Sequence, residues 1–387
     1  MERTSSRSKE TGDPKGRFRV GIVGAGMIAT APYGFLPGLR RLADTVEVAA
    51  ITSRTKERAE ALAHDWQIPT VYDDLASMLR DDSLDAVINL TPISAHYETS
   101  MSILEAGKHL VTEKPLASSM TEADDICELA ERKACLVMCA PIDMLRPEWV
   151  EARRLVQSGA LGTVAFARAH ASHAGPAAQS WPVDPSWFYQ RGAGPLLDMG
   201  VYGIDRLIGV LGPAQRVTAM SGITTSVRRA RGGPYDGADI QVTADDNTLL
   251  LLDFGGSTFA TLDATFNVVA TRAAPMEVYG SEGSLVVRRP GVAFDRGQLP
   301  LELFRVDAAP GLSGWITPRS VGANERPDRA QTLQRAILVE HLIECIATGN
   351  PPVPGPARAR HVLEVILAAQ TAAQEGRTMT LRTGFAD

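Results

Sequence analysis

The stretch Arg19-Val20-Gly21-Ile22-Val23-Gly24-Ala25-Gly26-Met27-Ile28-Ala29 decides the fold of this 387-residue chain. A short run rich in β-branched residues leads directly into the pattern G-x-G-x-x-A, and the residues that follow can start a helix. In this setting Gly24 permits a tight turn, Gly26 lets the backbone approach a pyrophosphate, and Ala29 allows close helix–strand packing. The stretch therefore predicts a dinucleotide-binding unit with a helix N-terminus facing the phosphates. A chance glycine turn is the alternative that the motif alone leaves open.

Strand and helix patterns alternate from Phe18 to about Pro141. The further strands are expected at 46–51, 85–90, 108–112 and 135–140, with helices at about 55–65, 97–106 and 121–133. Apolar strands that alternate with amphipathic helices indicate a parallel sheet covered on both faces. We expect a polar, flexible tail over residues 1–17 and an α/β domain of Rossmann type over residues 18–141.

The pattern changes after Arg146-Pro147. A helix at 148–158 precedes a loop over 175–194 that is rich in Pro, Gly and Trp, and strand-like runs then follow one another without intervening helices. These runs are expected at 216–224, 239–243, 248–254, 258–266, 276–279 and 284–287, before closing helices at about 329–348 and 356–375. Consecutive strands joined by short turns indicate an antiparallel or mixed sheet. We therefore expect a second domain, of α+β class, over residues 142–387.

The composition excludes several classes of protein. Hydrophobic residues make up 44% and charged residues 22%, as in ordinary globular chains, and the net charge is −6 without a basic cluster. We therefore expect no nucleic-acid partner. The four cysteines have no CxxC spacing, which favours reduced thiols and no metal site. Neither a membrane-spanning run nor a secretory leader is apparent, so we expect a cytoplasmic protein without membrane contact.

The end of the second strand bears on which phosphate a bound dinucleotide would carry. An NAD site usually places Asp or Glu there to bind the ribose 2′-hydroxyl. This chain has Ser53 and Arg54 instead, a hydroxyl and a guanidinium that suit a 2′-phosphate. The pair favours NADP, with NAD as the alternative. An ordinary polar turn with Arg54 in solvent is the less favoured alternative that the sequence leaves open.

Two further segments carry residues suited to proton transfer. Lys114, one of only six lysines, lies between Glu113 and Pro115 at the end of a strand, where ligands of open α/β sheets bind. Asp198 and Tyr202 follow a glycine-rich turn and, with Asp205, have the spacing of one helix face. A nearby lysine could lower the pKa of a tyrosine from about 10 toward neutrality. An exposed loop lysine and a half-buried core tyrosine are the alternatives.

Taken in order, these motifs resemble those of the Gfo/Idh/MocA family of NAD(P)-dependent oxidoreductases, named after glucose-fructose oxidoreductase, inositol dehydrogenase and rhizopine catabolism. The likeness covers the glycine loop, Thr91-Pro92 with His96, Glu113-Lys114-Pro115 and Asp198-x-Gly200-x-Tyr202, and extends from about Phe18 to Leu381. It implies an N-terminal Rossmann domain and a C-terminal domain with an open, mainly antiparallel sheet that often mediates homo-oligomer contacts. Cofactor and substrate would meet between the two domains.

The resemblance also implies roles for single residues. Cofactor-binding positions are Gly24, Gly26, Met27, Ile28, Ser53, Arg54, Thr91, Pro92, His96, Glu113 and Lys114. Lys114 would also contact substrate, Asp198 would bind a substrate hydroxyl, and Tyr202 would occupy the acid/base position. Pro115 is often cis in the family. Three departures stand out. Gly192-Ala193-Gly194 replaces the three glycines that often precede Asp-x-Gly, and Met144 replaces a common arginine. The loop over 175–191 carries Trp181 and Trp187, of which Trp187 could stack on a sugar ring, with packing in the core or a lid as the alternative.

The function expected from the resemblance is hydride transfer between a nicotinamide and a sugar, cyclic polyol or sugar derivative. A first alternative is an enzyme of the same fold that recycles its cofactor while it cleaves or rearranges glycosides. A second is a regulator that binds cofactor but has lost catalysis, against which the retained Lys114, Asp198 and Tyr202 argue. A tetrapyrrole reductase would have less need of the Asp198–Tyr202 segment.

Overall fold

The computed structural model describes residues 16–288, 300–318 and 329–386. The tail expected over residues 1–17 lies almost wholly outside these ranges. The chain divides into two compact units. The first comprises the chain up to Glu113 together with Glu122–Ala140 and Thr332–Gly355, and the second comprises Lys114–Thr121, Pro141–Gln331 and the chain from Pro356 onward. The segment Thr332–Gly355, expected within the C-terminal domain, thus belongs to the first unit by its contacts.

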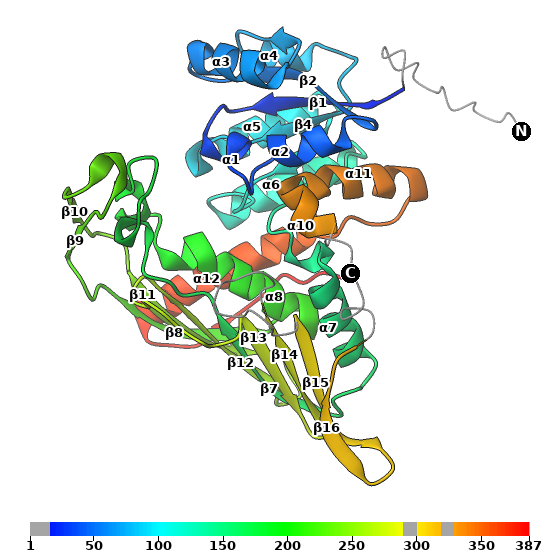
Figure 1. The fold of residues 1–387 in the computed structure, drawn as a ribbon, viewed down its shortest axis with the longest axis vertical. Coiled ribbons are helices and arrows are strands. Elements are labelled where there is room, and N and C mark those ends of the chain that lie inside the picture. Colours follow the sequence, from blue (N-terminus) through cyan, green and yellow to red (C-terminus); the bar gives the residue numbers. More distant parts are fainter. Residues whose placement is uncertain (1–15, 289–299, 319–328, 387) are drawn as a thin grey trace, which may run out of the picture. The chain divides into compact units, whose positions relative to one another are not determined.

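A six-stranded parallel sheet forms the centre of the first unit (Figure 1). Its strands are β1 (Phe18–Val23), β2 (Val46–Thr52), β3 (Thr70–Val71), β4 (Ala86–Asn89), β5 (His109–Thr112) and β6 (Val137–Cys139). The order β3-β2-β1-β4-β5-β6 is that of the Rossmann fold, as the alternating pattern predicted. Because all six strands are parallel, the glycine loop after β1, Ser53 after β2, Thr91 after β4 and Glu113 after β5 lie at the same edge.

Helices connect these strands, and one of them differs from expectation. They are α1 (Met27–Thr30), α2 (Leu36–Leu39), α3 (Lys56–Trp66), α4 (Leu75–Leu79), α5 (Ile93–Glu105) and α6 (Met120–Arg132). The glycine loop was expected to lead into a helix, and it does, but α1 is a single turn. Ala31 leaves it with ψ near 151° because the ring of Pro32 disfavours helical geometry at the preceding residue.

The returning segment from the C-terminal part of the chain completes the first unit. One helix was expected over 329–348, whereas the structure has α10 (Arg329–Leu333), a 3₁₀ turn (Gln334–Ala336) and α11 (Ile337–Thr348). Gln334, at φ 50°, is in the left-handed region and breaks the helix. A Cβ atom at Gly38 would lie 2.0 Å from the Leu333 carbonyl oxygen, so a glycine is needed where α2 meets this segment.

The second unit is built on a nine-stranded sheet, mainly antiparallel as expected. Its order is β16-β15-β14-β13-β7-β12-β11-β8-β17, and β7 with β12 is the one parallel pair. The strands are β7 (Val164–His170), β8 (Arg216–Gly222), β11 (Asn247–Asp253), β12 (Phe259–Thr265), β13 (Met276–Gly280), β14 (Gly283–Val287), β15 (Leu301–Ala309), β16 (Leu312–Ile316) and β17 (Met379–Thr380). The sequence patterns did not indicate β15, β16 or β17.

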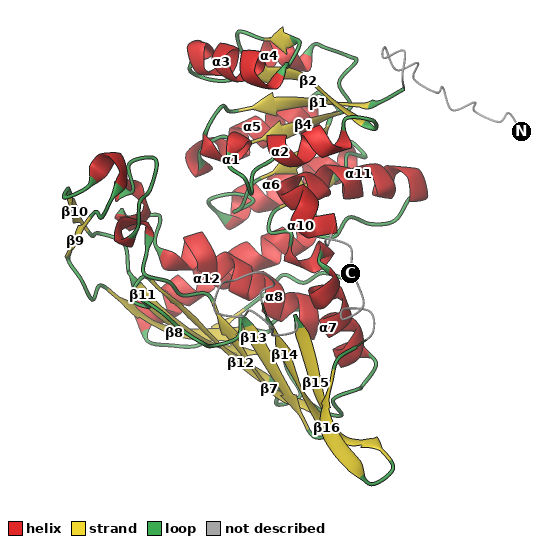
Figure 2. Cartoon of the chain, viewed as in Figure 1, coloured by secondary structure: helices red, strands yellow, loops and turns green. Residues whose placement is uncertain are grey.

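Helices cover one face of this sheet, and no helix of the described residues lies on the other face, which we call the open face (Figure 2). The covering helices are α7 (Pro147–Gln157), α8 (Val201–Leu211) and α12 (Pro356–Glu375). Along β11, Leu250 and Leu252 are buried, whereas Leu249 and Leu251 are 53% and 45% exposed. This alternation is typical of an antiparallel sheet with one buried face. None of the helices in the described part of the chain is long and apolar enough to cross a membrane.

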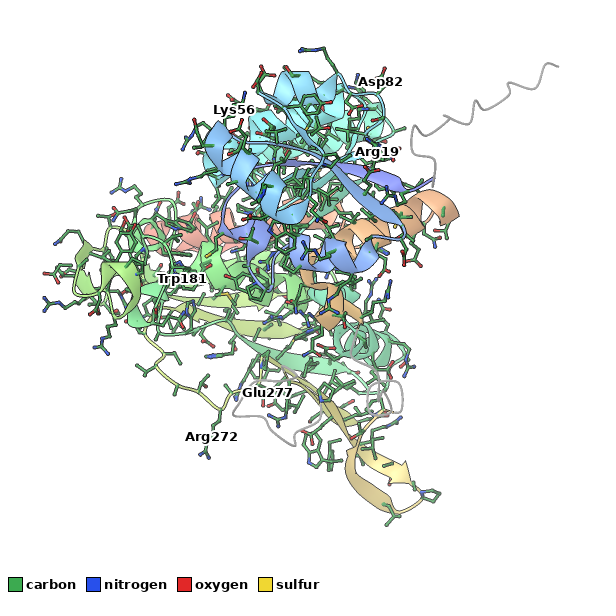
Figure 3. The ribbon with its side chains drawn as sticks, turned by 45° about the horizontal axis from the view of Figure 1, so that its top comes forward. Arg19, Lys56, Asp82, Trp181, Arg272 and Glu277 are labelled. Atoms are coloured by element: carbon green, nitrogen blue, oxygen red, sulfur yellow. The ribbon has the colours of Figure 1, made fainter. Side chains whose placement is uncertain are left out.

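A small lobe with its own apolar core extends the second unit. The loop expected over 175–194 packs there against the hairpin of β9 (Val227–Arg229) and β10 (Asp239–Gln241). Trp181 lies in this lobe (Figure 3) and packs against its core. The core consists of Ala177, Phe188, Tyr189, Ala230, Ile240, Val242 and Phe266. The loop is therefore an ordered part of the unit.

Candidate active site

The glycine loop after β1 has the geometry that a dinucleotide requires. Gly24 is at φ 109°, and its N–H donates to the Thr52 carbonyl at 2.8 Å. A Cβ atom on Gly24 would lie 2.7 Å from the Leu90 carbonyl oxygen, whereas one on Gly26 would meet no described atom within 4 Å. Gly24 therefore serves the turn itself, and Gly26 leaves open space above the backbone. This open cradle fits the pyrophosphate of the predicted cofactor.

The end of β2 offers hydroxyl and guanidinium groups. Arg54 is exposed, and the Ser53 hydroxyl accepts a hydrogen bond of 3.4 Å from the Thr55 N–H. The Thr52 hydroxyl is buried and finds no hydrogen-bond partner in the described residues. These groups suit a phosphorylated ribose, since a phosphate accepts hydrogen bonds and attracts Arg54.

The turn after β4 is held from within by buried polar side chains. His96 is 1% exposed, and its Nε2 atom lies 2.9 Å from the Thr91 carbonyl oxygen. The Thr91 hydroxyl donates to Asn89 at 2.7 Å, and Asn89 in turn donates to Ser100 at 3.1 Å. His96 was expected beside the cofactor, and in the structure its ring fixes the turn that presents Thr91 and Pro92.

Glu113, at the end of β5, is paired with a residue that the motifs did not reveal. Its buried carboxylate accepts a hydrogen bond from Arg335, which also donates to the Tyr33 carbonyl at 2.8 Å. The Arg335 guanidinium lies 5.5 Å from the centre of the Tyr33 ring. Arg335 thereby ties β5 to the segment that follows the glycine loop. It is 222 residues from Glu113, and no local pattern could have indicated the pair.

Lys114 belongs to the second unit, where it contacts the segment around Asp198. The Lys114–Pro115 peptide bond is cis. The ammonium group donates to the Asp198 carbonyl at 2.5 Å and to the Leu197 carbonyl at 3.4 Å. It also lies 3.6 Å from Oδ1 of the Asp198 carboxylate. Lys114 thus binds both the backbone and the side chain of the predicted substrate-binding residue.

A π-helical turn, Leu196–Gly200, explains why these carbonyls face an ammonium group. Within it the N–H of Val201 bonds to the carbonyl of Leu196, five residues earlier. The wider spacing displaces carbonyls from the α-helical ladder, which leaves them to other donors. π-helical turns of this kind recur at functional sites.

The same turn corrects the expected face of Asp198, Tyr202 and Asp205. One extra residue rotates the positions after it by about 100°, so helical spacing does not hold across the turn. Asp205 is instead buried and accepts a hydrogen bond of 2.8 Å from Arg358. Burial raises the pKa of its carboxyl against the opposing charge of Arg358. Asp205 is thus part of a buried ion pair with α12.

His173 is a site residue that the motifs missed. Its Nε2 atom lies 3.4 Å from Oδ2 of Asp198, and its Nδ1 atom accepts a hydrogen bond of 3.1 Å from the Gly175 N–H. An accepting Nδ1 places the ring proton of a neutral imidazole on Nε2, toward the carboxylate. Only its position three residues beyond β7 could have drawn attention to it.

The Asp198 carboxylate therefore lies between two donors. Burial raises the pKa of this carboxyl, but the neighbouring His173 imidazole and the charge of Lys114 outweigh burial and hold the pKa below its usual value. Tyr202 is half-buried one turn further along, with the Lys114 ammonium 5.3 Å from the centre of its ring. A cation, a carboxylate, an imidazole and a phenol thus form one cluster, which we call the proton-transfer cluster: Lys114, His173, Asp198 and Tyr202. Such groups can hold a hydroxyl and move its proton.

Trp187 and Met144, two further residues that the sequence analysis singled out, lie outside the proton-transfer cluster. Trp187 is 49% exposed in the lobe and stacks on Phe188, with 3.9 Å between ring centres. Met144 is buried, and a Cβ atom on Gly209 would lie 2.5 Å from its sulfur, so Met144 packs closely on α8. Among the described residues no three His, Cys, Asp or Glu side chains could hold a metal ion.

A Rossmann sheet with an open glycine cradle, together with a second unit that carries a proton-transfer cluster, defines a two-domain oxidoreductase that uses a nicotinamide cofactor. Residues 18–140 match the family described as "Oxidoreductase family, NAD-binding Rossmann fold". Residues 149–286 match the family described as "GFO/IDH/MocA C-terminal domain". The two matches together span more than half of the chain. The protein belongs to the Gfo/Idh/MocA family of NAD(P)-dependent oxidoreductases, as the sequence motifs predicted.

Individual relatives agree with this assignment. The chain is 30% identical over 277 residues to the uncharacterized oxidoreductase ORF334 of Rhizobium meliloti, which covers 70% of this chain and 75% of that protein. It is 28% identical over 336 residues to D-xylose 1-dehydrogenase (NADP(+)) 2 of Haloferax volcanii, which covers 84% and 97%. The fold superposes on levoglucosan dehydrogenase in complex with NADH and L-sorbose with a TM-score of 0.80, at 21% identity, covering 95% of this chain and 99% of that one.

Proposed function

We propose that the protein is a dehydrogenase that oxidises or forms a CH–OH group of a sugar, cyclic polyol or sugar derivative, with Tyr202 as the acid/base. The observation that carries this proposal is the position of one ammonium group beside two other members of the proton-transfer cluster. Lys114 Nζ lies 3.6 Å from the Asp198 carboxylate and 5.3 Å from the centre of the Tyr202 ring. A dehydrogenase of secondary alcohols needs these groups, a proton acceptor and a donor that orients the hydroxyl.

The residues of the first unit would hold the cofactor. Gly24, Gly26, Met27 and Ile28 would take the pyrophosphate, and Thr91, Pro92 and Glu113 would line the same edge of the sheet. When bound, the nicotinamide supplies the hydride acceptor for oxidation or the hydride donor for reduction. We propose NADP as the preferred form, because Ser53 and Arg54 offer a hydroxyl and a cation where NAD sites usually place a carboxylate.

In the oxidation direction, Tyr202 takes the proton of the substrate hydroxyl while the C–H bond on the same carbon is broken. Lys114 stabilises the negative charge of the phenolate, and Asp198 accepts a hydrogen bond from a neighbouring hydroxyl. His173 orients Asp198, since its Nε2–H faces Oδ2 at 3.4 Å. In reduction the same proton returns from Tyr202 to the carbonyl oxygen.

The charges of the cluster favour a neutral substrate. Lys114 and Asp198 offset one another, so a substrate carboxylate or phosphate would find no spare charge on this pair. Hydroxyl-rich rings match the alternating donors and acceptors of Lys114, Asp198 and His173. The exposed face of Trp187 would suit the apolar face of such a ring.

We also propose that copies of this chain associate through the open face of the nine-stranded sheet. Met220 is 82% exposed there, with Leu249 and Leu251 about half exposed on the neighbouring strand. An apolar face of this kind favours association. Light scattering on a Leu251→Glu variant should show a smaller particle than the unmodified chain, and an unchanged mass would contradict this contact.

Tyr202→Phe tests the proposed activity. With NADP and a panel of neutral sugars and polyols, we expect turnover to fall by about 10²- to 10⁴-fold, the usual loss of a positioned acid/base. NADPH affinity, titrated by tryptophan fluorescence, should change little, because the hydroxyl serves the substrate. Tyr235→Phe, at a 40% exposed position of the lobe, is the matched control and should keep full turnover. Near-full turnover of Tyr202→Phe on the best substrate would assign the proton to another residue.

A further inference from the structure

We propose that Arg206 is a positioning residue of the acid/base site: its guanidinium, fixed by Asp143, lies against the ring of Tyr202 and favours the negatively charged phenolate. This inference rests on the proposed function, in which Tyr202 exchanges the substrate proton. It gives a role to a buried pair that no motif indicated. Arg206 acts through Tyr202 and contacts neither substrate nor cofactor on this reading.

The placement of Arg206 follows from helix geometry. Tyr202 and Arg206 are four residues apart on α8, so their side chains lie on one face. The Arg206 side chain is only 5% exposed. Its Cζ atom lies 6.0 Å from the centre of the Tyr202 ring and 5.1 Å from the centre of the Trp149 ring on α7. The guanidinium is thus enclosed by aromatic surfaces.

Asp143 holds the guanidinium without neutralising the region. Its Oδ2 atom accepts a hydrogen bond of 2.8 Å from Arg206 Nε, and its Oδ1 atom lies 3.6 Å from Nε of Arg146. One carboxylate is therefore shared by two guanidinium groups. The terminal nitrogen NH1 of Arg206 is buried and has no hydrogen-bond partner in the described residues. A pair that served packing alone would not need an excess cation or an unpaired buried donor, both of which cost stability.

The other charged groups around α8 are held by partners of their own. On α12, Arg358 binds Asp205, whose carboxyl also interacts with the charges of Arg206 and Asp143. His361 is neutral because burial lowers its pKa to about 4. On α7, Glu151 is paired with Arg154, and Glu148 is buried. From the sheet, His170 is paired with Asp263, and Asp198 of the π-helical turn lies between Lys114 and His173.

Two cations therefore lie within about 6 Å of the Tyr202 ring centre, Lys114 at 5.3 Å and Arg206 at 6.0 Å. A positive charge at this distance favours the anionic form of a phenol. Lys114 also faces Asp198, which offsets part of its charge. Arg206 supplies a cation that contacts no group of the proton-transfer cluster other than the Tyr202 ring in the contacts that the structure describes.

The test removes the charges in pairs, so that no lone charge stays buried. The variant Asp143→Asn/Arg206→Met is compared with Asp205→Asn/Arg358→Met, a second buried pair joined to the same helix. For substrate oxidation we expect the first variant to move the midpoint of the pH dependence of kcat upward by about one unit and to lower kcat at pH 7 by about tenfold. KM for substrate and the affinity for NADPH should stay within about twofold. The control pair should lower Tm without moving the midpoint.

Two single changes keep the inference testable if the double variant does not fold. Arg206→Lys, which retains a cation, should keep the midpoint, whereas Arg206→Gln should shift it. An unchanged midpoint in both Arg206→Gln and the double variant, while Tyr202→Phe is inactive, would overturn the inference and leave the proposed function intact. If Tyr202→Phe is itself fully active, the proposed function fails first.

Discussion

The cofactor edge of the first unit and the proton-transfer cluster of the second are built in opposite ways. The site at the cofactor edge is formed mainly by the backbone: Gly24 turns the chain, and Gly26 leaves open space above it. The proton-transfer cluster is formed by side chains, and Lys114, His173 and Asp198 come from segments far apart in the sequence. A site made of backbone is encoded in a few consecutive residues, whereas a site made of side chains depends on long-range packing.

The two regions also treat charge differently. Arg54 at the cofactor edge is exposed, ready for an anionic ligand. In the second unit several charged groups are buried in pairs, such as Asp205 with Arg358, each with 1% side-chain exposure. A buried ion pair holds its two side chains in fixed positions, but the loss of one partner leaves the other charge buried without compensation. We therefore expect the first region to respond to changes of shape and local charge, and the second to changes of protonation.

Substitutions in the glycine loop should have the largest effect, and they separate its two functions: the turn at Gly24 and the dinucleotide cradle at Gly26. Gly24→Ala forces a side chain into φ 109° and into the Leu90 carbonyl, which should lower the free energy of unfolding by about 4 kcal/mol. Gly26→Ala meets no described atom and should keep its stability while it loses affinity for the dinucleotide. Urea denaturation and NADPH titration of both variants measure the contrast. A stable Gly24→Ala with normal affinity would contradict this reading of the loop.

Mild acid should act on the second unit through His361. Burial lowers the pKa of this ring to about 4, and its Nε2 atom accepts a hydrogen bond of 3.0 Å from the Ala214 N–H. Between pH 6.5 and 4, His361 is protonated in the unfolded chain but stays neutral in the folded chain. The free energy of unfolding therefore falls as the pH falls. The loss should be about 2 kcal/mol at pH 5 and about 3 kcal/mol by pH 4.

Denaturation at pH 7 and pH 5 checks the role of His361 against two variants. His361→Gln removes the ring but keeps an acceptor for Ala214, so its stability should depend less on pH by about 2 kcal/mol. His64→Gln, at an exposed position of α3 in the first unit, should behave as the unmodified chain does. Equal pH dependence in all three proteins would refute the assignment.

The smallest expected effect concerns the choice of cofactor. Ser53→Asp places a carboxylate where it can bind a ribose 2′-hydroxyl and repel a 2′-phosphate, which should shift the preference from NADPH to NADH by about 1–3 kcal/mol. Tryptophan fluorescence titration with both cofactors measures the shift. Ser77→Asp, which adds the same charge at the start of α4, is the control. If the unmodified chain binds NADH as tightly as NADPH or more tightly, the predicted preference for NADP is wrong.

Much of the fold could be read from local patterns. Alternating apolar strands and amphipathic helices predicted the Rossmann sheet, and the closing helix expected at 356–375 coincides with α12. The strands that escaped prediction are β3, β9, β15, β16 and β17. All of them except β15 are two to five residues long, too short to show a periodic pattern. The expected single helix over 329–348 is broken at Gln334, which has φ 50°, and the adjacent Leu333 lies against Gly38 of α2, a contact between residues far apart in the sequence.

The sequence by itself determined the family, the cofactor loop and the identity of Lys114, Asp198 and Tyr202 as candidates. These features are local, because each is set by a few neighbouring residues and by the period of strand or helix. Only the tertiary structure decided what surrounds them. The residues before α8 form a π-helical turn, after which Asp205 pairs with Arg358. The His173 imidazole lies beside Asp198, and the Arg335 side chain pairs with Glu113. The physical reason is distance along the chain. A side-chain contact between segments separated by scores of residues depends on how whole elements pack, and no local pattern records it.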